Sequence, residues 1–408
     1  MNKYTAAISY ILPLLLITLI CGQSNTTTAQ EKSPEITIDE SLSIIAKPAP
    51  EWSALFIRTD GWTGADGVFS IPLTGSEKRN QGDNARTMID FGDTFIGKVD
   101  PVDHHRLPGT KMVNSTIAIL KGNQPIVNNI SFKYARDEKG NPKSLIIPNT
   151  PSAKPDQWYW LADGITINDK TFVFAFRMKR RGTGGTFDFA TAGEVLLTTN
   201  PAHPFDEPPI QKEMPLFLKK TDTRGEIIFG SAILPNTIEA DAPDPDGFIY
   251  VYGAESIPFT KKMVVARVKP EAFDDVSKWE FYTGSTWSKN ITDAIGMAPR
   301  ISMSYSVTPI TKNRYLLVFQ EDTIGKFVAV RLGKTPVGPW GPIHEVYQCP
   351  EVIEGKKTFV YNAKAHPHLS KPGELLVSYN VNSGDFWSHF KHANIYHPRF
   401  IRLILNNK

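Results

Sequence analysis

Two aspartates in the first quarter of the chain have the residue type and spacing for acid–base chemistry. Asp66 lies in "TGADG", just before the apolar run "VFSIPL", and Asp93 follows the apolar run "TMIDFG". If these runs are paired antiparallel strands, one starts where the other ends, and both carboxyls lie at the same end of a sheet. Glycosidic cleavage needs such a pair, because one carboxyl protonates the leaving oxygen while the other activates water or attacks the sugar. The alternative is that both are ordinary turn residues, since Asp next to Gly is common in turns.

The equivalent strand ends elsewhere in the chain carry polar and aromatic residues that could bind a sugar. Aromatic faces stack on sugar rings, while Arg, Asn and carboxylates bond to the hydroxyls. Glu255 is also a third carboxylate that could replace one aspartate, and His366 could orient a carboxylate; both have a purely structural alternative. The predicted substrate-binding residues are Trp62, Asn114, Trp160, Asp163, Arg177, Glu255, Tyr305, Gln320, His366 and Asn382.

Metal and cofactor signals are weak. "AHPHL" places His366 and His368 two residues apart, and "DHH" gives a second cluster at residues 103–105, but neither has a convincing third ligand. We therefore predict no metal site and no cofactor. "KRRGTGG" at residues 179–185 lacks the lysine-terminated pattern of a phosphate loop and is predicted to be a loop over the cleft.

The elements that must position these residues are strands. Short runs of β-branched and aromatic residues alternate with Gly, Pro, Asn and Asp turns, and no long segment has helical spacing, which predicts an all-β protein. Strand pairs recur five times, with further strands between them. This repetition predicts a five-bladed β-propeller with four-stranded blades over residues 51–408, its ring closed by the N-terminal strand "EWSALFIRT"; two β-sandwiches are the alternative. The pairs are "DGVFSIPL" with "TMIDFGDTF", "WYWLADGITI" with "KTFVFAFRM", "EIIFGSAIL" with "GFIYVYGAE", "ISMSYSVTPI" with "RYLLVFQED", and "FVYNAKAHPHLS" with "ELLVSYNVN".

The N-terminal segment resembles a secretory signal. A lysine is followed by an apolar run from Ile8 to Ile20 and a small-residue stretch, which predicts a signal peptide over residues 1–29 and a linker over residues 30–50. We therefore expect an exported protein, periplasmic, cell-surface or extracellular. Cys21 offers an alternative lipid anchor, and Cys349 would then be the only cysteine of a mature chain without disulfides.

Charge excludes some partners. The formal net charge of +3 is spread without a basic block, so we expect no nucleic acid partner and no membrane contact apart from an anchor at Cys21. The predicted partner is a polysaccharide or oligosaccharide.

The segments "DGVFSIPL", "FGDTFIG", "NSTIAI", "WYWLADG", "IYVYGAE", "KWEFYTGSTW" and "YNAKAHPHLSKPGELLVSYNVN" resemble a bacterial family long catalogued as a domain of unknown function, some members of which are endo-D-arabinanases. The resemblance runs from about Asp60 to the end. It implies a five-bladed propeller, hydrolysis of furanosidic arabinan linkages, and Asp66 and Asp93 as the catalytic pair. The insertion "TGSEKRNQGDNART" departs from the family and could reshape the substrate mouth.

These features favour an exported glycoside hydrolase of arabinan-like polysaccharide. A non-catalytic glycan-binding propeller is the alternative. A lyase acting on an acidic glycan is a third interpretation, and it would rely on Arg177 and Arg300 to neutralise a uronate.

Overall fold

The computed structural model describes residues 33–79, 82, 84–185, 187–352 and 357–407. The predicted signal peptide and the anchor candidate Cys21 lie outside the described residues. Within the described part of the chain, no helix is long and apolar enough to cross a membrane.

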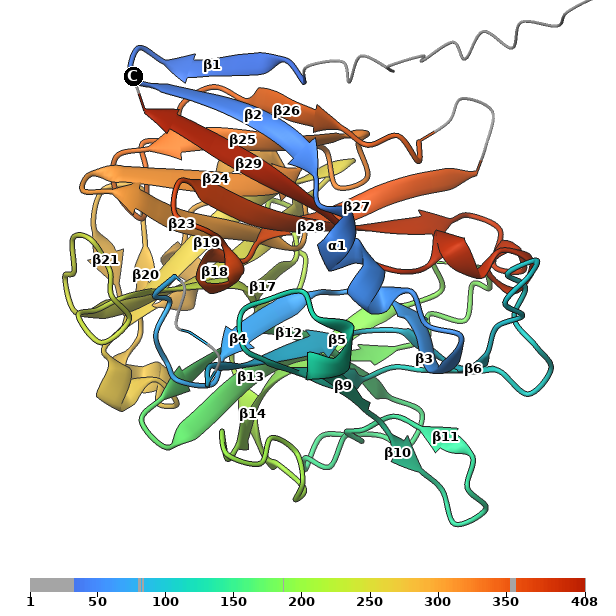
Figure 1. The fold of residues 1–408 in the computed structure, drawn as a ribbon. Coiled ribbons are helices and arrows are strands. Elements are labelled where there is room, and N and C mark those ends of the chain that lie inside the picture. The colour runs from blue at the N-terminus through green and yellow to red at the C-terminus, as the bar shows by residue number, and fades with distance from the viewer. Residues whose placement is uncertain (1–32, 80–81, 83, 186, 353–356, 408) are drawn as a thin grey trace, which may run out of the picture. The chain divides into compact units, whose positions relative to one another are not determined.

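The described chain is all-β, with strands in five sheets of four or more strands and two smaller sheets (Figure 1). Sheet 1 contains β4 (Phe69–Pro72), β5 (Arg86–Phe91), β8 (Thr116–Lys121) and β9 (Ile130–Lys133). Sheet 2 contains β12 (Trp158–Ile167), β13 (Lys170–Lys179), β14 (Ala190–Thr199) and β15 (Ile210–Met214). Sheet 3 contains β16 (Phe217–Leu218), β17 (Ile227–Asn236), β18 (Phe248–Ile257), β19 (Thr260–Val268), β20 (Glu280–Tyr282), β21 (Trp287–Ser288) and β22 (Met297–Ile301).

Sheet 4 contains β23 (Tyr305–Thr311), β24 (Arg314–Gln320), β25 (Phe327–Gly333) and β26 (His344–Gln348). Sheet 5 contains β27 (Thr358–Ala365), β28 (Glu374–Ser383), β29 (Arg399–Asn407), β2 (Leu42–Pro48) and β1 (Glu35–Asp39). The smaller sheets are β3 (Asp60–Ala65) with β6 (Thr94–Lys98) and β7 (Lys111–Val113), and β10 (Ala135–Arg136) with β11 (Pro142–Lys143).

Helices are short. The described chain has α1 (Pro50–Ser53) and α2 (Ser388–Lys391), and the 3₁₀ turns η1 (Ala54–Phe56), η2 (Val127–Asn129), η3 (Pro270–Ala272), η4 (Val276–Lys278), η5 (Ile291–Asp293), η6 (Pro367–Leu369) and η7 (Ala393–Ile395).

All five predicted strand pairs form antiparallel ladders, one in each of the five sheets. The pairs are β4 with β5, β12 with β13, β17 with β18, β23 with β24, and β27 with β28. Apolar runs bounded by turn residues were therefore sufficient to identify these strands.

Neighbouring sheets are held together by five hydrophobic clusters. One cluster joins sheets 1 and 2 and includes Ile71 and Val173, and the next joins sheets 2 and 3 through Phe174 and Phe229. Two more join sheets 3 and 4 and sheets 4 and 5. The last cluster packs Phe91 of sheet 1 with residues of sheet 5. Each of the five sheets thus buries apolar side chains against two others.

Two predictions for the N-terminal part of the described chain were wrong: the linker and the ring-closing strand "EWSALFIRT". The described part of the predicted linker is not a linker, because β1 and β2 lie there and β2 pairs along its length with β29 (Figure 1, blue beside red). Leu42 and Ile44 are buried in the same cluster as β29, so the segment has a strand pattern with a buried face. "EWSALFIRT" does not supply a strand, since Pro50 begins α1 and the following residues form η1.

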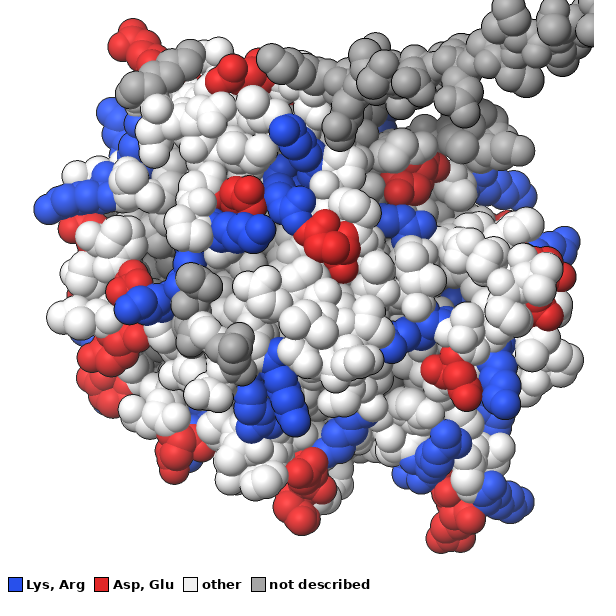
Figure 2. Space-filling model, in the orientation of Figure 1, with Lys and Arg blue, Asp and Glu red and all other residues white. Residues whose placement is uncertain are grey.

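Charged residues of both signs are interspersed on the face drawn in Figure 2. On the part of this face that is not grey, blue and red groups alternate without a continuous basic patch.

Candidate active site

Asp66 and Asp93 lie in two turns that contact each other. Asp66 precedes β4 and Asp93 follows β5, and the Asp66 N–H donates to the Asp93 carbonyl at 3.2 Å. The Gly92 N–H donates back to the Asp66 carbonyl at 2.9 Å. A Cβ on Gly92 would stand 2.9 Å from Asp66 Oδ1, so a side chain at position 92 would crowd this carboxyl. The strand pairing thus brings the two carboxylates together, as predicted.

Asp93 is held by two neutral donors. Asn114 Nδ2 and Trp160 Nε1 each donate to Asp93 Oδ1 at 2.8 Å. Burial raises the pKa of Asp93, while these two hydrogen bonds and the charge of Arg180 oppose the rise because they stabilise the ionised form. Asn114 follows β7 and Trp160 lies in β12. The two donors to Asp93 therefore come from the turn after the small sheet of β3, β6 and β7 and from sheet 2.

Asp66 has two tyrosines beside it. The Tyr361 hydroxyl donates to Asp66 Oδ2 at 2.5 Å, and Tyr396 also favours the ionised form of this carboxyl and so opposes a rise of its pKa. Burial first, and the neighbouring charge of Asp93 second, raise the pKa of Asp66 to about 7. Near neutral pH the two carboxyls therefore differ: Asp66 keeps its proton for a large part of the time, whereas Asp93 has Arg180 and two donors that favour its charge.

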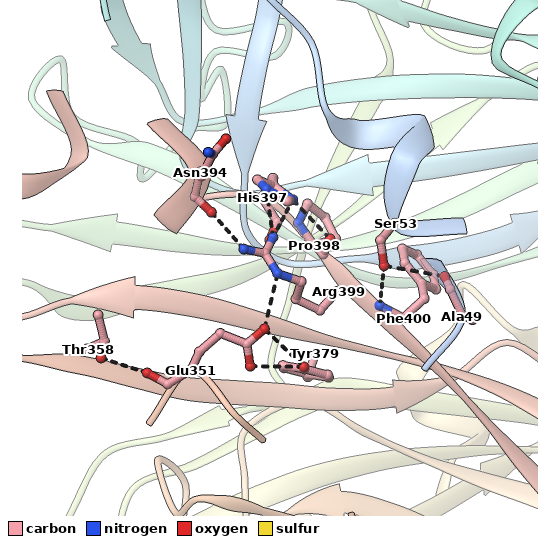
Figure 3. A network of polar contacts seen from close by, with 10 residues as sticks. All are labelled: Ala49, Ser53, Glu351, Thr358, Tyr379, Asn394, His397, Pro398, Arg399 and Phe400. Atoms are coloured by element: carbon pink, nitrogen blue, oxygen red, sulfur yellow. Dashed lines mark hydrogen bonds and ion pairs between the residues drawn. The ribbon is translucent and has the colours of Figure 1, made fainter. Parts of the chain in front are cut away.

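Tyr396 reaches Asp66 from the segment between β28 and β29. Arg399, at the start of β29, donates to the carbonyls of Asn394 at 2.7 Å and His397 at 3.0 Å, on either side of Tyr396 (Figure 3). The same guanidinium contacts Glu351, which also accepts from the Tyr379 hydroxyl (Figure 3). This network ties the segment to sheet 5 and so positions Tyr396.

A cavity of about 1000 Å³ lies at the two carboxyls. This volume is at the upper end of the usual range for small-molecule sites, about 300 to 1,000 Å³. All five sheets, or the turns beside them, contribute to its lining, which combines aromatic rings with charged groups. The aromatic members are Phe69, Trp158, Trp160, Phe176, Phe187, Phe189, Phe359, Tyr361, Phe386 and Tyr396, and the charged ones besides the pair are Asp156, Arg180, Arg181, Asp188, Glu226 and Lys261.

Of the residues predicted from the sequence, Asp66, Asp93, Asn114, Trp160 and Asn382 line this cavity. The loop at residues 179–185 also lies there, since Arg180, Arg181 and Gly185 are part of the lining. The other predicted substrate-binding residues lie elsewhere.

Asp163 and His366 are misplaced in the prediction because neither lies at the start of its strand. β12 starts at Trp158 and β27 at Thr358, as the predicted runs do to within one residue, so Asp163 lies partway along β12 and His366 just beyond the end of β27. Asp163 accepts from Lys364 at 2.8 Å, and both side chains are buried. His366 is buried between the hydroxyls of Ser70 and Ser378. The buried Asp163–Lys364 pair borders a separate cavity of about 50 Å³, which has room for a few water molecules but not for a sugar.

Arg177 and Glu255 point away from the cavity because side chains alternate along a strand. Phe176 and Met178 line the cavity, and Arg177 between them bonds to Glu213 at 2.8 Å. Similarly, Ser256 lines the cavity whereas Glu255 contacts Arg224 at 3.3 Å.

Trp62, Tyr305 and Gln320 are structural. Trp62 is 2% exposed and packs between Phe56, Phe91 and Phe132. The Tyr305 hydroxyl donates to the Gly253 carbonyl at 2.6 Å from within the core. The Gln320 amide donates to the carbonyls of Gly325 and Phe327, which stabilises the turn after β24.

Neither predicted cation for an acidic glycan lines the cavity. Arg177 bonds to Glu213, and Arg300 forms ion pairs with Asp322 at 2.6 Å and Glu321 at 2.8 Å. The lyase interpretation therefore loses the residues on which it depended.

The described residues of the insertion also lie away from the carboxyl pair. The insertion connects the end of β4 to the start of β5, and Asp66 and Asp93 are at the opposite ends of these strands. Among its described contacts, the Glu77 N–H donates to the Ala240 carbonyl and Arg79 donates to the Glu374 carbonyl. For the described residues, the expectation that the insertion reshapes the substrate mouth is wrong, because the antiparallel connection places them at the other end of the sheet.

The histidine clusters do not form an evident metal centre in the described residues. His366 contacts two serines and His368 contacts Glu77 at 3.1 Å, so the two rings have separate partners. Asp100, Asp103 and His105 have ligand atoms within 4.8 Å of one another, but they lie in a solvent-facing turn between β6 and β7. Exposed acidic turns are common without an ion, and we assign none here.

Sequence reasoning missed Tyr361, Tyr396 and His389. Tyr361 is near the start of β27, inside the predicted strand "FVYNAKAHPHLS", but the prediction took His366 from this strand instead. His389 lies in α2 and Tyr396 directly follows η7, in the segment between β28 and β29, whose sequence has no pattern that points to the carboxyls.

Residues 50–406 match the family described as "Domain of unknown function (DUF5005)". No curated protein matches the chain. A solved structure of a Bacteroides ovatus protein named as a candidate hydrolase is similar, with a TM-score of 0.65 and 20% identity over 90% of this chain and 93% of that chain. An α-L-arabinofuranosidase from Podospora anserina covers 86% of this chain and 98% of its own at 10% identity and a TM-score of 0.39. One from Coprinopsis cinerea covers 85% and 97% at 9% identity and a TM-score of 0.40.

Proposed function

Because the chain belongs to the DUF5005 family and has a pair of unlike carboxyls in a large aromatic cavity, we propose that it is a glycoside hydrolase that uses Asp66 and Asp93. The observation that carries the proposal is the contact between the two turns, which places two carboxyls with different donors side by side. The fold shared with the Bacteroides ovatus protein is compatible with it.

The two carboxyls have separate roles in the proposal. Asp66, with a pKa raised to about 7, protonates the glycosidic oxygen, because a general acid works best when its pKa is near the operating pH. Asp93, held by Asn114 and Trp160, acts in its ionised form and either activates water or attacks the anomeric carbon.

The fold in this proposal is a five-bladed propeller. Its support is the set of five sheets and the five clusters that join each sheet to two others. In this arrangement β2 is the fourth strand of sheet 5 and closes the ring beside β29.

The substrate in this proposal is a furanosidic, arabinan-like polysaccharide. Rings such as Trp158, Phe187 and Phe359 supply apolar faces, and the polar groups of the lining bond to hydroxyls. The furanosidic linkage itself comes from the sequence resemblance. The N-terminal 29 residues support export, as a secreted protein or one anchored at Cys21.

The test is product release from a panel that includes D-arabinan-containing mycobacterial polysaccharide and plant L-arabinan. The mature chain should shorten at least one polymer, and Asp93→Asn should not, while it still binds the same polymer. Asp206→Asn is the matched control, because this exposed carboxylate pairs with Lys133 and is not part of the cavity lining. Binding without product from the mature chain would instead support the glycan-binding alternative.

A further inference from the structure

Each carboxyl of the pair is held by a different part of the fold. Asp93 accepts from Asn114 and Trp160, whereas Asp66 accepts from Tyr361 of β27, and Tyr396 also favours its ionised form. The Tyr361 hydrogen bond to Asp66 therefore comes from sheet 5, whereas the two hydrogen bonds to Asp93 come from β12 and the turn after β7.

The Tyr361 hydroxyl has a fixed direction. Its oxygen accepts from Asn382 Nδ2 at 2.9 Å, and its single proton is donated to Asp66 Oδ2 at 2.5 Å. Because Asn382 occupies an acceptor site on the oxygen, the proton is directed at the carboxyl.

Asn382 is itself fixed by two contacts. The Ser383 N–H donates to Asn382 Oδ1 at 2.7 Å, and His389 Nε2 lies 2.9 Å from the same oxygen. His389 Nδ1 is 2.8 Å from the Phe386 carbonyl, and Arg106 donates to the carbonyl of His389. The chain of contacts from Asp66 therefore ends on backbone groups that packing keeps in place.

We propose that Tyr361 is a positioning residue for Asp66, and that Asn382 and His389 hold its hydroxyl toward the carboxyl. The contact engages Oδ2 of a carboxyl that lines the cavity. The catalytic meaning of this inference rests on the proposed function, but the contact itself can be tested without a substrate.

The charged and titratable groups around Asp66 determine how its pKa should change when the Tyr361 hydroxyl is removed. Asp93, Tyr361 and Tyr396 act on this carboxyl directly, Arg180 acts on Asp93, and His389 lies behind Asn382. A hydroxyl that donates to a carboxylate stabilises its ionised form. Without Tyr361, burial and the charge of Asp93 remain, so the pKa of Asp66 should rise.

The experiment uses Tyr361→Phe in the mature chain. The carboxyl of Asp66 is titrated by NMR with ¹³C-labelled aspartate, and its signal is assigned by its loss in Asp66→Asn. The midpoint should move upward by about one pH unit, the value expected for a hydrogen bond to a charged group. In the pH profile of kcat/KM the alkaline limb should move in the same direction, and kcat should fall about tenfold because the acid is less well oriented.

Tyr250→Phe is the matched control. Tyr250 of β18 also donates its hydroxyl to a carboxylate, Asp246, at 2.6 Å, and neither residue lines the cavity. The variant should lose stability without changing the titration of Asp66. An unchanged Asp66 midpoint in Tyr361→Phe, or an equal shift in Tyr250→Phe, would overturn the inference.

A second variant keeps the test decisive if Tyr361→Phe does not fold. Asn382→Ala leaves the hydroxyl but removes the group that directs it, so a smaller upward shift is expected, and no shift would overturn the inference. If the mature chain cleaves no polysaccharide while the midpoint still moves, the hydrolase proposal fails and the Tyr361–Asp66 contact is supported.

Discussion

Replacing Asp66 with asparagine should stabilise the fold at alkaline pH and change little at acid pH. The pKa of Asp66 rises from 3.8 to about 7 on folding, so the folded state binds more protons than the unfolded state between these values. Stability therefore falls as pH increases through this window, and the full penalty is present above about pH 7.

The magnitude follows from the size of the pKa difference. About three pH units at about 1.4 kcal/mol each give an upper value of about 4 kcal/mol. The Asp66 residue is not fully shielded from solvent, because its carboxyl borders the cavity, and screening there reduces the value to about 2 to 3 kcal/mol. The neutral amide of the variant has no charge to bury and escapes this penalty.

The assay is urea unfolding of the mature chain and of Asp66→Asn at pH 4 and pH 8, followed by circular dichroism. The midpoint of the variant should exceed that of the wild type at pH 8 and nearly equal it at pH 4. Asp206→Asn is the control, because its ion pair with Lys133 lowers the pKa of Asp206 and its loss cannot stabilise the protein at pH 8. A variant that gains nothing at pH 8, or that gains equally at both pH values, would refute the reasoning.

Three further changes have distinct expected outcomes. Trp160→Phe keeps a ring but removes the donor to Asp93, so the pKa of Asp93 should rise and the acidic limb of the kcat/KM profile should move to higher pH. Lys364→Met leaves the buried Asp163 without its partner and should lower the free energy of unfolding by about 3 kcal/mol in urea titrations at neutral pH. Deleting residues 34–48 removes β2 and opens the edge of β29, so the shortened chain should unfold at lower urea concentration and self-associate in light scattering.

The strands were predictable because their apolar runs are bounded by turn residues. The pairing of β4 with β5, which places Asp66 beside Asp93, follows from this pattern alone. The role of β2 was not predictable in the same way, because only pairing with β29 at the far end of the chain explains why Leu42 and Ile44 are buried.

The candidate site was only partly predictable, since a shift of one residue along a strand reverses the face of a side chain. The prediction chose Arg177 and Glu255 for the cavity, but the side chains that line it belong to the next residues, Met178 and Ser256. Asp163 and His366 were misplaced along their strands, and both proved to be internal polar groups. Tyr396 depends on an irregular segment held by Arg399, which no local pattern reveals.

The central claim is that Asp66 supplies a proton while Asp93 acts as a carboxylate. The most direct test compares hydrolysis of two oligosaccharides that differ only in the leaving group, a sugar or a dinitrophenol that needs no protonation. Asp66→Asn should lose activity on the first and keep much of it on the second, whereas Asp93→Asn should lose both. Equal losses on both substrates in Asp66→Asn, or wild-type activity in Asp93→Asn, would contradict the account.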